Sequence, residues 1–205
     1  NLRINKKKFI YLISPNKITE QFFKDIHLLL NTGKVSFFQL RLKKYSLKKK
    51  ISIGKKIKNI CKKYNVKFLI NDDPQLALKL KADGCHLGQN DVSIKEARKI
   101  IGEKIIGITC HNSISLAKKA IKAKASYLAF GAFYSSKTKK TKHIASVKIL
   151  NKIRELTKIP IIAIGGINSN NYKNLLLNNA NFLAISGYIW KNKKYEPLEA
   201  LEKLK

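Results

Sequence analysis

Acidic residues are scarce in this chain, and three of them follow short apolar segments that read as strands. Only 12 of the 205 residues are Asp or Glu. Asp72 and Asp73 come directly after Lys67–Asn71, and Asp91 comes after Gly84–Leu87. Mg²⁺ usually takes one or two such carboxylates, with waters and substrate phosphates completing its shell. Asp73 and Asp91 could instead cap helices. We expect Asp73, which precedes Pro74, to be a cap, and Asp72 and Asp91 to be the metal ligands.

A second group of polar residues alternates along the sequence. In Gln39-Leu40-Arg41-Leu42-Lys43, every second side chain would point to one side of a strand, which places a forked guanidinium beside a flexible ammonium. This arrangement suits a phosphate or a diphosphate. The alternative is a basic strand end that only meets solvent.

Two further segments could bind phosphate. Ser136 and Thr138 supply hydroxyls beside the cation of Lys139, although loops of this composition are commonly only solvated. Gly165-Gly166 and Ser186-Gly187 follow two apolar segments, and glycine lets backbone N–H groups approach a phosphate closely. The alternative for the glycines is a simple turn into the next helix.

Two more residues at predicted strand ends carry groups that could contact a substrate. His86 could act as a base, but a histidine there is as often a packed or hydrogen-bonding residue, so we assign it no proton transfer. Thr109 ends another apolar segment and offers a hydroxyl.

Eight apolar segments alternate with segments of helical period, which is the pattern of repeated βα units and a parallel sheet. The order permits a closed barrel or an open sheet. Polar groups follow nearly all of the predicted strands, whereas an open sheet would gather them at one switch point. We therefore predict a single (β/α)8 (TIM) barrel domain over residues 1–205. The predicted strands are Phe9–Ser14, Val35–Arg41, Lys67–Asn71, Gly84–Leu87, Lys104–Thr109, Tyr127–Gly131, Pro160–Gly165 and Phe182–Ser186.

Helix signals occur between these strands. Ser93 and Glu96 fit a capping box, and Gly102 fits a helix end. Asn168 to Asn171 could cap a helix whose buried side holds Tyr172, Leu175 and Leu176. After the second strand, six residues fall on one helical stripe: Leu47, Ile51, Gly54, Ile57, Cys61 and Tyr64.

The composition limits the possible partners and locations. The 43 Lys and Arg residues outnumber the 12 Asp and Glu residues and give a net charge of +31, which raises the possibility of a polyanionic partner. No nucleic-acid-binding motif accompanies the charge, so we predict no nucleic-acid partner. Three cysteines at unrelated spacings indicate reduced thiols and a cytoplasmic protein. No apolar run is long enough for a membrane span or a signal-peptide core. The oligomeric state is not predicted.

Taken in order, these segments resemble the thiamine phosphate synthase family over essentially the whole chain. The resemblance is carried by Gln39–Lys43, Asn71–Asp73, Ala82–Asp91, Gly107–Thr109, Thr138-Lys139, Ala163–Ile167 and Ile185-Ser186. It implies a Mg²⁺-dependent transferase that joins an aminopyrimidine diphosphate to a thiazole phosphate and releases diphosphate. The expected mechanism is a dissociative displacement that depends on placement and charge.

The resemblance also implies roles for individual residues. Asp72 and Asp91 would bind magnesium, and Thr109 would lie near the pyrimidine. The pyrimidine diphosphate would be bound by Gln39, Arg41, Lys43, Asn71 and Lys139, of which Arg41, Lys43 and Lys139 are the expected catalytic cations. The thiazole phosphate would be held by Ser136, Thr138, Gly166, Ile185 and Ser186.

The sequence departs from the family pattern in a few places. Thr109 replaces a usual serine and Ser136 a usual threonine, and both keep the hydroxyl. Ala132 and Ser135 stand where prolines are usual, which leaves the contacts of that loop open. Two alternatives remain, a related thiazole tautomerase and a basic RNA-binding or non-catalytic barrel. The tautomerases usually lack the aspartate that matches Asp91.

Overall fold

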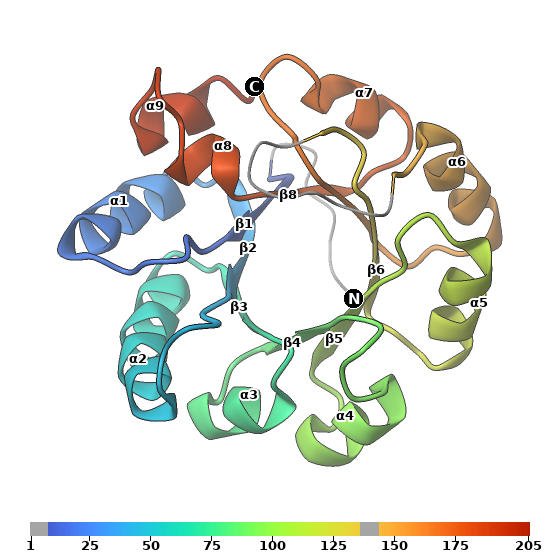
Figure 1. Cartoon of the computed structure of the whole chain (residues 1–205), viewed down its shortest axis with the longest axis horizontal. Coiled ribbons are helices and arrows are strands. Elements are labelled where there is room, and N and C mark those ends of the chain that lie inside the picture. The colour runs from blue at the N-terminus through green and yellow to red at the C-terminus, as the bar shows by residue number, and fades with distance from the viewer. Residues whose placement is uncertain (1–7, 136–143) are drawn as a thin grey trace.

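Eight parallel strands close into a barrel surrounded by helices (Figure 1). The computed structural model describes residues 8–135 and 144–205. The strands pair in chain order, and β1 also pairs with β8, which closes the ring. The strands are β1 Ile10–Ile13, β2 Val35–Leu40, β3 Lys67–Asn71, β4 Gly84–Leu87, β5 Ile105–Thr109, β6 Tyr127–Phe130, β7 Ile161–Ile164 and β8 Phe182–Ile185. The predicted barrel is confirmed, and each strand agrees with its predicted range to within one residue at either end.

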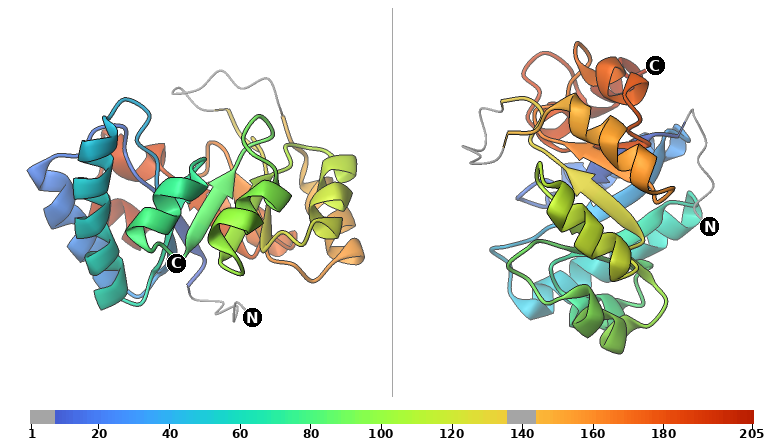
Figure 2. Two further views of the ribbon diagram at one scale, coloured as in Figure 1. Left: turned by 90° about the horizontal axis from the view of Figure 1, so that it is seen from below. Right: turned by 90° about the vertical axis from the view of Figure 1, so that its right-hand side faces the viewer.

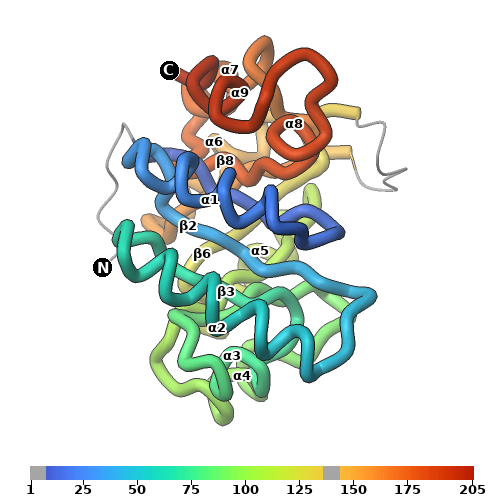
Figure 3. Tube along the Cα trace, turned by 90° about the vertical axis from the view of Figure 1, so that its left-hand side faces the viewer, coloured from blue at the N-terminus to red at the C-terminus, as the bar shows by residue number. Residues whose placement is uncertain are grey.

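Helices follow the strands and cover the outside of the barrel, as the two side views show (Figure 2). They are α1 Glu20–Asn31, α2 Leu47–Lys63, α3 Pro74–Leu80, α4 Ile94–Ile101, α5 Ile114–Lys122, α6 Val147–Leu156, α7 Tyr172–Leu177, α8 Gly187–Trp190 and α9 Pro197–Glu202. The last helix, α9, packs against α1, so both ends of the helical ring meet (Figure 3). Within the two described ranges, no helix has the length and apolar character needed to cross a membrane.

The core has two layers because alternate residues of each strand point to opposite faces. The outer layer lies between strands and helices and includes Phe38 and Leu40 of β2. The interior of the barrel is filled by a smaller cluster that includes Phe37 from the same strand. Gln39 is buried as well, 3% exposed, and bonds to an interior residue. Strand β2 therefore directs Phe37 and Gln39 into the barrel, as the period of two predicts.

Most helices begin at a side chain that caps them. Thr19, Ser46, Asp73, Ser93, Ser113 and Ser146 each accept a hydrogen bond from a backbone N–H of the helix that follows. Asp73 Oδ1 accepts from the N–H of Leu76 at 3.0 Å, with Pro74 as the first helical residue. The expected cap at Asp73 is confirmed. Such caps stabilise a helix by about 1 kcal/mol.

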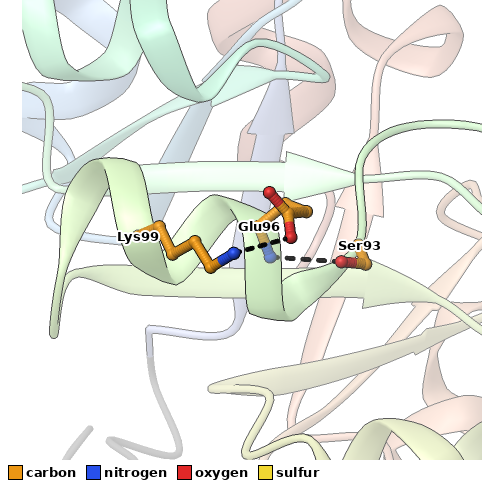
Figure 4. Close-up of polar contacts among 3 residues, drawn as sticks. All are labelled: Ser93, Glu96 and Lys99. Atoms are coloured by element: carbon orange, nitrogen blue, oxygen red, sulfur yellow. Dashed lines mark hydrogen bonds and ion pairs between the residues drawn. The ribbon is translucent and has the colours of Figure 1, made fainter.

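The helix predictions for α4, α2 and α7 hold in part. Ser93 Oγ caps α4, but the Glu96 carboxylate pairs with Lys99 Nζ at 3.1 Å (Figure 4), so only half of the capping box is seen. Of the predicted stripe in α2, Gly54, Ile57 and Cys61 are buried, whereas Leu47 at the start of the helix is 57% exposed. Asn171 precedes α7 without a side-chain cap bond.

Candidate active site

The ends of β3 and β4 bring two of the predicted site segments together. The backbone N–H of Asp72 donates to the carbonyl oxygen of His86 at 2.7 Å. Asp72 has a φ of 55°, a left-handed conformation in which the chain leaves the strand sharply. Its Oδ2 accepts from the amide Nδ2 of Asn71 at 3.1 Å. Asn71 and Asp72 are therefore held side by side over the end of β4.

Asp91 lies in the loop after β4 and does not cap α4, which is capped by Ser93. Its Oδ2 accepts from the backbone N–H of Gly88 at 2.6 Å, which closes the loop and fixes the carboxylate. Burial, followed by the negative charge of Asp91, raises the pKa of Asp72. The two carboxylates that sequence analysis selected therefore lie close enough for their charges to interact.

A pocket of about 240 Å³ opens beside Asp72, between the ends of β2 and β3. Its polar side is formed by Lys43, Lys50, Asn71, Asp72 and Asp73, and its apolar side by Leu40, Leu42, Ile70 and Leu76. The charges of Lys43 and Lys50 act to lower the pKa of Asp72 and so oppose its rise. Mixed charge of this kind, open to solvent, suits an anion that arrives with a cation.

Lys50 is a residue that sequence analysis missed. It lies in the first turn of α2, where its backbone N–H donates to the carbonyl oxygen of Ser46. Lys48, Lys49 and Lys50 are consecutive, and only the helix geometry shows that Lys50 is the one of the three that lines the pocket. The residue types carry no signal that separates the three lysines, because the choice depends on how α2 is rotated about its axis.

Arg41 follows β2 directly and has a fixed backbone. Its N–H donates to Ser14 Oγ at 2.8 Å, which ties the end of β2 to the end of β1. Burial, and then the positive charge of Arg41, lowers the pKa of His86 to about 4. Arg41 therefore lies within electrostatic reach of His86, whose carbonyl oxygen holds Asp72.

Beneath this opening, polar side chains form a continuous network inside the barrel. Gln39 Nε2 donates to Tyr11 Oη at 2.7 Å, and Tyr11 Oη lies 2.6 Å from Tyr127 Oη. Tyr127 Oη lies 2.7 Å from His86 Nδ1, and His86 Nε2 lies 2.8 Å from Thr109 Oγ1. We call these five residues the barrel network. Sequence analysis missed Tyr11 and Tyr127, since a tyrosine in an apolar strand reads as core until its direction is known.

The loop after β6 packs against the end of β7, and this close packing explains why Gly165 and Gly166 are glycines. The backbone N–H groups of Phe133 and Tyr134 donate to the carbonyl oxygens of Ile164 and Gly165. A Cβ at Gly166 would lie 2.7 Å from the carbonyl oxygen of Tyr134, and its φ is 62°. Glycine is required for this close approach, and phosphate binding at Gly166 stays a prediction.

At the end of β8, the structure limits which groups could contact a substrate. The side chain of Ile185 is buried in the outer core, so any substrate contact at this position must come from its backbone. Ser186 is half-buried, and its Oγ donates to the carbonyl oxygen of Ser14 at 3.4 Å. Ser136, Thr138 and Lys139 lie outside the described residues.

The described part of the chain contains no group of three or more His, Cys, Asp or Glu side chains that could together hold a metal ion. Asp72 and Asp91 are two carboxylates only. Each has one oxygen engaged by a neighbouring N–H group. Such a pair suits an ion that completes its coordination shell with water and a bound phosphate.

Comparisons with known proteins agree over nearly the whole chain. A family model described as thiamine monophosphate synthase matches residues 10–189. A thiamine-phosphate synthase of Pelagibacter ubique is 65% identical over 204 residues, which cover 99% of this chain and 98% of that protein. A thiamine-phosphate synthase of Erythrobacter litoralis is 39% identical and covers 93% of this chain and 92% of its own length.

Among solved structures, the thiamine phosphate pyrophosphorylase of Pyrococcus furiosus has a TM-score of 0.87 and 28% identity, covering 100% of this chain and 96% of that one. The similarity therefore extends to sequence and to the arrangement of the barrel.

Proposed function

The chain belongs to the thiamine monophosphate synthase family, and from that premise we propose how its residues carry out the synthase reaction. The protein is a transferase that joins an aminopyrimidine methyl diphosphate to a thiazole phosphate, with release of diphosphate. The observation that carries this function is the 65% identity to a thiamine-phosphate synthase over 99% of the chain.

We propose that the diphosphate lies at the opening between β2 and β3. Arg41 follows β2 directly, and Lys43 lines the pocket that also contains Asn71 and Asp72. Arginine offers a fork of N–H donors and lysine a mobile point charge, so together they fit two linked phosphates. Lys139 would complete this set from the loop after β6.

Asp72 and Asp91 are the proposed magnesium ligands. The pKa of Asp72 is raised by burial and then by the charge of Asp91, so a cation between the carboxylates would relieve their repulsion. Each carboxylate keeps one oxygen that the N–H bonds of Asn71 and Gly88 do not use. A bound Mg²⁺ would supply positive charge next to the departing diphosphate.

The side chains then act by binding and placement. When the bond between the methylene carbon and the diphosphate oxygen breaks, both electrons leave with the diphosphate, whose charge Arg41 and Lys43 neutralise. The aminopyrimidine ring stabilises the methylene cation, and the lone pair of the thiazole nitrogen forms the new C–N bond. His86 is partly buried, its pKa is lowered, and both of its ring nitrogens bond to hydroxyl groups, which supports our assignment of no proton transfer to it.

The thiazole phosphate is placed at the ends of β7 and β8. The backbones of Gly166, Ile185 and Ser186 would face it, together with the hydroxyls of Ser136 and Thr138. Barrels frequently bind a phosphate between the loops after their seventh and eighth strands, which supports this placement.

A two-substrate assay tests the proposal. Purified protein is given the pyrimidine diphosphate and the thiazole phosphate, with and without Mg²⁺, and both diphosphate and thiamine phosphate are measured. We expect equal amounts of both products and a requirement for Mg²⁺. Isomerisation of the thiazole phosphate without diphosphate release would favour the tautomerase. Full activity in the presence of a chelator would remove magnesium from the mechanism.

The proposal also covers the domain organisation, the partners and the cellular location of the protein. We propose that residues 1–205 form one catalytic domain, that its partners are phosphorylated small molecules and not nucleic acids, and that it acts in the cytoplasm. The three cysteines are buried and free, which supports a reducing compartment.

A further inference from the structure

The barrel network joins two of the proposed pyrimidine-binding residues through the core. Gln39 lies at one end and Thr109 at the other, and the hydroxyls of Tyr11 and Tyr127 with the His86 ring connect them. We propose that Tyr11 and Tyr127 are positioning residues that make Gln39 a hydrogen-bond acceptor and Thr109 a hydrogen-bond donor toward the aminopyrimidine. This inference rests on the proposed function, together with the roles that the family resemblance implies, in which Gln39 binds the pyrimidine diphosphate and Thr109 lies near the pyrimidine.

The direction of the network follows from counting protons. Tyr11 Oη accepts from Gln39 Nε2, so its own single proton goes to Tyr127 Oη. The proton of Tyr127 then goes to His86 Nδ1, which must be the unprotonated ring nitrogen. His86 Nε2–H donates to Thr109 Oγ1, and the hydroxyl proton of Thr109 is left to donate elsewhere.

Burial keeps all hydrogen bonds of the barrel network pointing the same way, from Gln39 toward Thr109. Burial raises the pKa of Tyr11 and that of Tyr127, so both phenols stay protonated. In an apolar interior an unpaired donor or acceptor costs about 1–3 kcal/mol, so one reversed bond forces its neighbours to reverse as well.

The neighbouring residues hold the rings in place. The Tyr127 ring stacks on His86 with centroids 5.7 Å apart and planes at 20°. It lies directly against Gly107, where a Cβ would fall 1.8 Å from Tyr127 Cζ. Phe37 contacts both tyrosine rings, so the phenols can be replaced by phenylalanine in an environment that already accepts aromatic rings.

The resulting pattern matches an aminopyrimidine. Gln39 Nε2 donates one of its two protons to Tyr11, and Oε1 is left as the acceptor for an exocyclic amino group. Thr109 presents a proton that a ring nitrogen can accept. A network of the opposite direction would present an amide donor and a hydroxyl acceptor, which would repel both groups of the substrate.

The first experiment needs no substrate. Full-length protein labelled with ¹⁵N in its histidines reports the His86 tautomer by NMR, and loss of one signal set in His86→Gln assigns it. We expect Nε2 protonated and Nδ1 unprotonated in the wild type, and a mixture of tautomers in Tyr127→Phe. Protonated Nδ1 in the wild type, or an unchanged tautomer in Tyr127→Phe, overturns the proposal.

The second experiment measures kinetics. Tyr11→Phe and Tyr127→Phe should each raise KM for the pyrimidine diphosphate by about fivefold, the value of one hydrogen bond, and leave KM for the thiazole phosphate unchanged. Tyr172→Phe is the matched control. Tyr172 is also buried, and its hydroxyl donates to the backbone carbonyl oxygen of Lys205 and accepts from the backbone N–H of Lys205, but it lies on α7 outside the barrel. It should lose stability without a change in either KM.

The two experiments separate the inference from the proposed function. A wild type without synthase activity would refute the function, while the NMR experiment would still decide the direction of the network. An active wild type whose KM for the pyrimidine substrate is the same in Tyr127→Phe and in Tyr172→Phe would refute the positioning role. Thr109→Val, which removes the hydroxyl that accepts from His86 Nε2, should raise the KM for the pyrimidine diphosphate.

Discussion

The backbone N–H of Asp72 donates to the carbonyl oxygen of His86 across 2.7 Å, and this bond joins the two polar parts of the molecule. Asp72 belongs to the charged opening, and His86 belongs to the barrel network beneath it. The carboxylate that is proposed to hold magnesium and the ring that orients Thr109 are therefore fixed to each other through two adjacent strand ends.

Asp91→Asn should remove Mg²⁺-dependent diphosphate release and leave the fold intact. The asparagine keeps an oxygen that can accept the N–H of Gly88, so the loop after β4 stays closed. Loss of the negative charge should lower turnover by about a hundredfold, measured as diphosphate released at saturating substrates. Asp25→Asn, on α1, is the charge-matched control. Equal turnover of the two variants would take Asp91 out of the metal site.

Lys50→Ala should weaken diphosphate binding, because Lys50 lines the pocket beside Asp72. Calorimetry with inorganic diphosphate and Mg²⁺ should show a Kd raised about threefold to tenfold, as expected for one partly screened charge. Lys49→Ala removes the same charge from the neighbouring exposed position of α2 and should change the Kd little. If both variants bind alike, only net charge matters and Lys50 has no specific role.

The sequence predicted the fold well because the decisive information is local. A run such as Ile161–Ile164 can only be a strand covered on both faces, and the caps at Asp73 and Ser93 mark helix starts through their own side chains. The stripe of α2 did not show which of its residues are covered, and Leu47 is exposed, because burial of a first helical turn depends on which neighbours reach it.

The candidate site was predictable where chemistry and strand ends coincide, as at Asp72 and Asp91. The site was not predictable where a residue's role depends on the direction in which its side chain points. Tyr11 and Tyr127 are separated by 116 positions, and their hydroxyls meet only because both side chains point into the barrel. The choice of Lys50 among consecutive lysines likewise depends on the rotation of α2.

Gly107→Ala should destabilise the protein through a steric clash. The new Cβ would lie 1.8 Å from Tyr127 Cζ, so the ring must move away from His86. Overpacking of this kind costs about 1–3 kcal/mol in the free energy of unfolding, measured by urea titration. Gly33→Ala is the contrasting control, because its φ is 72° but nothing lies within 4 Å. It should cost about 1–2 kcal/mol from the backbone alone and leave the tyrosine near-ultraviolet signal unchanged.

In Gly107→Ala that tyrosine signal should change, because the Tyr127 ring is displaced. If the tyrosine signal of Gly107→Ala is unaltered and its free energy of unfolding equals that of Gly33→Ala, the interior accommodates the methyl group.

The three buried cysteines should make the free energy of unfolding fall at alkaline pH. Burial raises the pKa of Cys110 to about 12, whereas the pKa of a thiol in the unfolded chain is about 8.5. Because the folded value is the higher one, the stabilisation is complete below the unfolded pKa and is lost as pH rises toward the folded pKa. Alkylation at neutral pH should accordingly proceed only at the rate of unfolding for Cys61, Cys85 and Cys110 together. Loss of stability between about pH 7 and about pH 10 should be smaller in Cys110→Ala, which lacks one such thiol, than in the wild type. An identical loss in both proteins would mean that lysine deprotonation, and not the thiol, governs the alkaline limit.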